Sequence, residues 1–189
     1  AQSAQSDSAF ASDLEEAQGY LEDNKLDAAS GKLDSLEQDS SLTDEQRKQV
    51  EDMKNKLQSA KDSAQQQQEN EQKKSERKQE FSSEMDELES DDLKISSAAN
   101  AEDELAMTAS SFEQWDELLS EMYDYLAGVL NADQYASEEE NYKQWVAERD
   151  SGAENAASAT EDSTQKQLAS YSFKQSYTKA RCYKLLDMM

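Results

Sequence analysis

The side chains of this sequence that could carry out acid–base or metal chemistry are mostly carboxylates, several in contiguous runs: Asp91-Asp92, Glu102-Asp103-Glu104 and Glu138-Glu139-Glu140. Hydrolysis by paired carboxylates needs two groups that converge in a cleft, with the pKa of one raised by burial. Neighbouring residues on a helix point in different directions, so we interpret these runs as solvated charged surface. They also lack the Asp-x-Asp-x-Asp-Gly pattern of a calcium loop. We therefore predict no catalytic residue, no metal site and no cofactor.

Histidine is absent and Cys182 is the one cysteine. This excludes a histidine-based catalytic triad, an ordinary zinc site and a disulfide within the chain. Cys182 falls on an apolar stripe of the last predicted helix. We interpret it as a small buried apolar side chain. The alternative is a reactive or dimer-forming thiol, whose pKa the neighbouring Arg181 could lower if exposed.

Arg149 is an informative polar residue, because it lies one helical turn after Trp145 on the same face. Its guanidinium is predicted to point into a helical bundle, where a buried charge needs acidic or carbonyl partners. Asp150 or a carboxylate on the preceding helix could supply the charge, and Gln175 and Thr178 on the last helix could supply hydrogen bonds. We interpret the group as a polar clamp that fixes the register of the helices. The alternative is a ligand-binding arginine.

Helices must position these groups, because the sequence has no proline, four glycines and many helix-favouring residues. The 35% hydrophobic content and the high charge also fit disorder. Periodic apolar stripes decide against disorder for residues 100–189, and Asn100 and Asn131 are predicted to start two of the helices. We predict an all-α helical bundle from three stripes: Phe112, Trp115, Leu119, Met122, Leu126 and Val129; Tyr135, Glu138, Tyr142, Trp145 and Arg149; and Leu168, Tyr171, Gln175, Thr178, Cys182 and Leu185.

Three parts of the chain differ in composition. Residues 1–64 contain short amphipathic stretches and predict a short N-terminal helical module with a thin core. Its helices are predicted to start at the capping boxes of Ser12 and Thr43, after about ten disordered residues. Residues 65–80 carry four acidic and four basic groups with almost nothing apolar, which predicts a polar, helical connector. Residues 81–189 form the predicted bundle.

The net charge of −24 is concentrated in one region, since residues 81–140 hold 18 acidic groups and only Lys94 as a base. Such a surface repels nucleic acids and speeds encounter with a cationic protein. Candidate contacts for this partner are Asp116, Glu117, Glu121 and Asp124. The longest unbroken apolar run, Tyr125–Leu130, is too short to span a membrane.

A set of motifs over Phe112–Met189 resembles the LprI-like lysozyme-inhibitor family of bacterial envelope proteins: Leu119-x3-Tyr123-x2-Leu126, then Trp145-x3-Arg149-Asp150, then Thr178-x2-Arg181. The resemblance covers somewhat under half of the chain. It implies a small helical domain, often exported or lipid-anchored, in which Trp145, Arg149, Asp150, Thr178 and Arg181 build the scaffold. Two departures are Ser120, where Asn is commoner in the family, and the absence of the paired cysteines of many relatives.

We therefore expect a non-enzymatic protein of the cell envelope that binds a cationic protein such as lysozyme through an acidic helical surface. The alternative is a structural spacer or assembly adaptor at the cell surface. The first residue is Ala, which we interpret as a trimmed or mature chain, from which any export or lipid-anchor segment would have been removed. The sequence assigns no oligomeric state.

Overall fold

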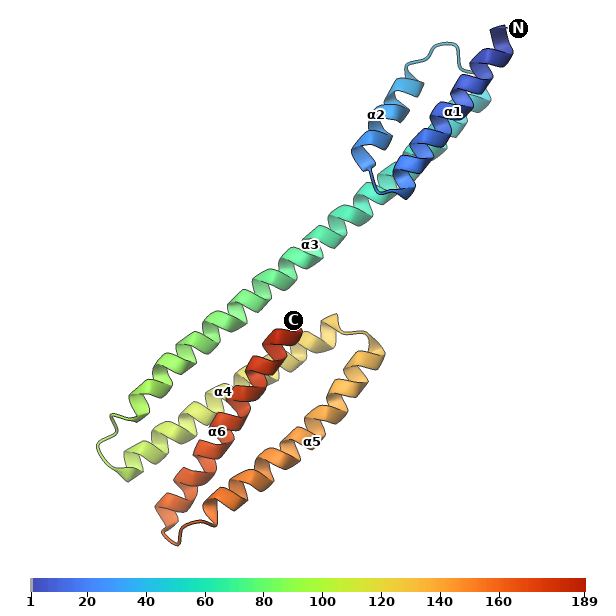
Figure 1. Ribbon diagram of the computed structural model, residues 1–189. Helices are drawn as coiled ribbons and strands as arrows, with labels where there is room; N and C mark the ends of the chain where they lie inside the picture. Colours follow the sequence, from blue (N-terminus) through green and yellow to red (C-terminus); the bar gives the residue numbers. More distant parts are fainter. Residues whose placement is uncertain (1) are drawn as a thin grey trace. The chain divides into compact units, whose positions relative to one another are not determined.

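The computed structural model describes the backbone of residues 2–189 and the side chains from residue 7 onward. Its described residues form six helices and no strand, which confirms the all-α prediction (Figure 1). The helices are α1 (Gln2–Glu22), α2 (Leu26–Glu37), α3 (Asp44–Ile95), α4 (Ala101–Val129), α5 (Ala132–Ala157) and α6 (Ser163–Met188). Among these helices, none combines the length and apolar character that a transmembrane segment needs.

The chain divides into two compact units, Ala1–Lys73 and Lys74–Met189. The division falls inside the predicted connector 65–80, which is part of the single helix α3. Every side chain from 65 to 73 is exposed. This stretch has no apolar face because its sequence is almost entirely Gln, Glu, Asn and Lys.

In the first unit, α1, α2 and the beginning of α3 surround a small apolar core: Phe10, Ala17, Ala29, Leu33, Leu36, Leu42, Val50, Met53 and Leu57. The predicted start of α3 is confirmed, because Thr43 and Gln46 form a reciprocal capping box. The predicted disorder of residues 1–10 is wrong for 2–10, which are helical, and Ser12 lies inside α1. Phe10 is the physical reason, since it extends the stripe of Leu14 and Ala17 by one turn and is buried. Ala1 lies outside the described residues.

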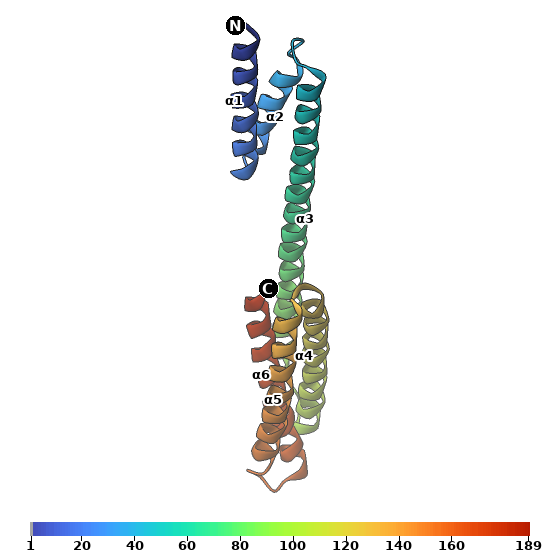
Figure 2. The ribbon, with the colours of Figure 1, turned by 90° about the vertical axis from the view of Figure 1, so that its right-hand side faces the viewer.

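The second unit contains the end of α3 together with α4, α5 and α6. The last three lie side by side, with α6 packed against both α4 and α5 (Figure 2). Asn100 and Asn131 cap α4 and α5 as predicted, and Asp162 caps α6. The core combines residues from all four helices: Phe81, Met85, Trp115, Leu118, Leu119, Met122, Leu126, Trp145, Cys182 and Leu185.

Aromatic rings form a continuous column through this unit. Tyr123 contacts Tyr142 at a centroid distance of 4.6 Å, Tyr142 stacks on Trp145 at 5.8 Å, and Trp145 stacks on Tyr177 at 5.7 Å. Phe173 continues the column on α6 by stacking on Tyr177. Its ring lies where a side chain at Gly152 would begin, 2.2 Å from an ideal Cβ position. Gly152 therefore lets α5 and α6 approach closely.

Candidate functional site

Arg149 forms the clamp between α4 and α5 that its spacing predicts. Its side chain is 11% exposed, and its Nη1 and Nε donate to Asp116 Oδ1 at 2.8 Å and to Asp150 Oδ1 at 3.1 Å. The guanidinium also lies over the rings of Phe112 and Trp145. Asp116 is thereby engaged in an ion pair within the protein, which weakens its predicted role in partner contact even though its side chain is 45% exposed.

The two polar residues predicted to join this clamp from α6 do not reach it. Gln175 donates to Ser111 Oγ at 2.7 Å instead. Thr178 is fully buried, and its hydroxyl has no hydrogen-bond partner among the described residues. Within the described residues no hydrogen bond joins either side chain to Arg149, so the clamp is made by α4 and α5 alone.

Arg181 and Glu138 form a second, more deeply buried pair that sequence reasoning missed. They are 6% and 5% exposed, and Arg181 Nη2 binds Glu138 Oε1. The Tyr123 hydroxyl accepts from Arg181 Nε at 2.9 Å and donates to Glu138 at 3.0 Å. Burial raises the pKa of Tyr123, so the phenol stays protonated and can donate. The group ties α4, α5 and α6 together.

The prediction that the acidic runs are simply solvated is wrong at Glu138 and at Asp92. Glu138 lies on the buried stripe of Tyr142 and Trp145, at spacings of four and seven, and this was the available signal. Asp92 accepts hydrogen bonds from Ser111 Oγ and from Trp115 Nε1. Each of these two runs thus places one carboxylate inward, where donors compensate its burial. The described residues contain no cluster of three or more potential metal-binding side chains.

Cys182 is fully buried, which confirms its interpretation as a core residue. Its thiol donates to the Trp115 carbonyl oxygen at 3.7 Å. Burial, and secondarily the charge of Asp116, raise the pKa of Cys182 to about 12. The thiolate is the reactive form, so the native chain is poorly reactive.

We expect Cys182 in the native chain at pH 8 to react with a disulfide reagent at least about 100-fold more slowly than in the urea-unfolded chain. The measurement is the rate of thiol release monitored by absorbance, with the unfolded chain as the reference. Equal rates in the two states would contradict the buried position of the thiol.

Six carboxylates lie at helical spacings along the end of α3 and along α4: Glu80, Glu84, Glu87, Asp91, Glu117 and Glu121. We call this group the acidic seam, and the space between its two rows the groove. The α3 members follow steps of four, three and four, and the α4 members are one turn apart, so each row occupies one helical face. Burial and then the like charge of Glu121 raise the pKa of Glu84. Glu84 and Glu121 also both lie within 4 Å of the Arg77 guanidinium, so the two rows approach each other at this point.

Arg77 is held where α3 and α4 meet in the seam. Its guanidinium lies 3.9 Å from the centre of the Phe81 ring. Its Nη1 is 2.9 Å from Glu80 and 3.8 Å from Glu84, and its Nη2 is 3.3 Å from Glu121. The predicted contact residues therefore differ in availability. Glu121 is engaged by Arg77, while Glu117 and Asp124 are exposed and have no ion pair within the described part of the chain.

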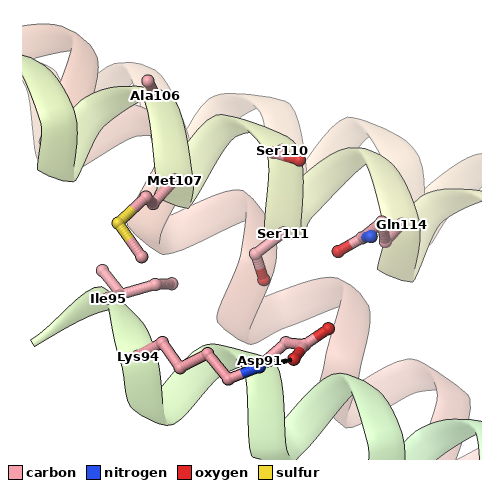
Figure 3. Close-up of a pocket in the computed structure, with 8 residues that line it drawn as sticks. All are labelled: Asp91, Lys94, Ile95, Ala106, Met107, Ser110, Ser111 and Gln114. Carbon is pink, nitrogen blue, oxygen red and sulfur yellow. Dashed lines mark hydrogen bonds and ion pairs between the residues drawn. The ribbon is translucent and has the colours of Figure 1, made fainter.

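The opposite end of the seam opens into a cleft of about 470 Å³ between the last turns of α3 and the first half of α4. In Figure 3, Ile95 and Met107 face each other across the cleft, and the Lys94 side chain folds back toward Asp91. Lys94 Nζ donates to Asp91 Oδ1 at 2.6 Å. Ala106, Ser110, Ser111 and Gln114 complete the lining from α4.

Comparisons with protein-family models, with curated proteins and with solved structures found no match to this chain. The resemblance of Phe112–Met189 to the LprI-like family therefore stays a prediction from the motifs.

Proposed function

We propose that this chain is a non-enzymatic protein of the cell envelope that captures a cationic protein along its acidic seam. Lysozyme is the candidate partner, because the resemblance of Phe112–Met189 names it and because lysozymes are cationic. The observation that carries the proposal is the seam itself, in which carboxylates of α3 and α4, most of them exposed, converge on the Arg77 guanidinium.

Arg77 supports the proposal by illustrating how the seam holds a cation. One guanidinium there contacts three carboxylates and an aromatic ring at once. The remaining seam members Glu87 and Glu117 are exposed and have no such partner within the described residues. Basic side chains of a partner would find acceptors in the same arrangement, and the surrounding negative field would speed their encounter.

Titration of lysozyme activity with the purified chain tests the proposal. We expect activity to fall with added chain at about 0.01 M ionic strength and to recover towards 0.15 M, because the Debye length shrinks from about 30 Å to about 8 Å. Full lysozyme activity with excess chain at low ionic strength would remove lysozyme as the partner. Inhibition that does not respond to salt would contradict the electrostatic mechanism.

A spacer or adaptor role is the second candidate, and the exposed stretch 65–73 of α3 favours it. A helical segment with no buried side chain is typical of a helix that bridges solvent between packed parts of a chain, which is what a spacer requires. Deleting seven residues, 66–72, removes two helical turns and preserves the register of α3. The capture proposal expects unchanged affinity for lysozyme after this deletion, whereas a spacer would lose its function in assembly.

A further inference from the structure

We infer that the cleft between Ile95 and Met107 receives one large apolar side chain from the basic segment that the acidic seam captures. The inference rests on the proposed function and adds a specific anchor to it. Its occupant is a basic, amphipathic peptide segment of a partner protein, recognised by its charge along the seam and by one aliphatic or aromatic side chain at the end.

The cleft can take an apolar side chain because Ile95 and Met107 face each other across it, within a lining that is otherwise mostly polar. Ile95 and Met107 are both partly exposed, and Ala106 adds a further apolar surface. Methionine adapts to side chains of different shape, since its thioether chain is flexible and polarizable. The one cation in the lining, Lys94, is paired with Asp91, so the two charges offset each other at the cleft.

The cleft is continuous with the acidic seam on both helices. On α3, Asp91 lies one turn before Ile95, and Glu87 lies one turn before Asp91 on the same face. On α4, Ser110 and Gln114 of the cleft lead at steps of four and three to Glu117, and then to Glu121. A segment lying in the groove would therefore meet an apolar contact at one end and carboxylates along the rest.

Charge complementarity selects a basic occupant rather than a neutral one. The region 81–140 carries 18 acidic groups and one basic group. An acidic or neutral segment in this groove would leave the carboxylates of the seam repelling one another, as Glu84 and Glu121 already do. A basic segment relieves that repulsion, and specificity among basic segments then comes from the apolar anchor.

Two synthetic lysine-rich peptides test the inference. They are identical except that one carries a single leucine where the other carries alanine. We expect the leucine peptide to bind the full chain about tenfold more tightly, the lower end of what burying a leucine side chain contributes. In Met107→Gln, which makes the cleft wall polar, this preference should fall to about twofold or less. The matched control is Leu93→Gln, because Leu93 is 77% exposed and does not line the cleft.

Isothermal calorimetry gives the six affinities of the two peptides for the three chains, and circular dichroism checks that both variants stay helical. A leucine preference lost in Met107→Gln and kept in Leu93→Gln supports the anchor. The same preference in all three chains, with binding that still weakens with salt, overturns the anchor and leaves the capture proposal standing. If neither peptide binds the native chain at low ionic strength, both are overturned.

Discussion

Replacing Arg181 with methionine is expected to lower the free energy of unfolding of the second unit by about 3–5 kcal/mol, because it leaves the buried Glu138 without its counter-charge. The Tyr123 hydroxyl also loses two donors. Urea unfolding monitored by tryptophan fluorescence measures the loss, since Trp115 and Trp145 are the two tryptophans and both lie in this unit.

The double variant Arg181→Met/Glu138→Leu separates the cost of an orphaned charge from the value of the pair. Apolar replacement of both partners removes the uncompensated carboxylate, so most of the lost stability should return. Lys143→Met is the matched control, because Lys143 forms ion pairs from an exposed position on the same helix as Glu138, and we expect it to change stability little. A loss of less than about 1 kcal/mol in Arg181→Met would contradict the buried pair.

Replacing Trp115 with alanine is expected to cost the second unit about 3–5 kcal/mol. Trp115 is fully buried at the centre of the core, and its indole N–H donates to Asp92 Oδ2 at 3.1 Å. The substitution opens a cavity and removes a donor from a partly buried carboxylate. Unfolding by urea is again the measurement, with Trp145 as the remaining fluorophore.

Two further variants distinguish the parts of this effect. Trp115→Phe keeps much of the apolar volume and loses the hydrogen bond to Asp92, so its cost should be intermediate. Leu93→Ala removes an exposed side chain and should change stability little. If Trp115→Ala were no more costly than Leu93→Ala, the assigned core of the second unit would be incorrect.

The helices and much of the core could be predicted from the sequence, because apolar spacing and capping residues act locally. The predicted stripe is buried at Trp115, Leu119, Met122 and Leu126, whereas its last member, Val129, is exposed. Asn131 forms the capping box that its spacing with the residue three positions on predicts. These features depend on the order of residues within one helix, which the sequence contains directly.

The buried polar pairs could be predicted only in part, because they depend on which helices are neighbours. Periodicity places Glu138 on a buried stripe, but a run of three glutamates looks solvated when its members are considered together. The identity of the partner, Arg181, requires knowing that α5 packs against α6. The partners of Arg149 were easier to predict, because Asp150 is its neighbour in sequence and the other partner lies on α4, the helix directly before α5.

Only the α4 members of the acidic seam could be predicted from the sequence, for the same reason. Glu117 and Glu121 were candidate contacts from the charge distribution on α4. The α3 row opposite them, including Glu84 and Glu87, requires the packing of α3 against α4. Asp116 was placed among the contacts because composition does not reveal that Arg149 occupies it.

The most direct test of the capture proposal compares two triple variants that change the net charge equally. Glu84→Gln/Glu87→Gln/Glu117→Gln neutralises the seam, and Glu154→Gln/Glu161→Gln/Asp187→Asn neutralises exposed carboxylates elsewhere in the same unit. The measurement is the affinity for lysozyme by calorimetry at low ionic strength. We expect the seam variant to bind about tenfold more weakly than the native chain and the control to stay within about twofold. Equal weakening in both variants would show that only net charge matters and would contradict capture along the seam.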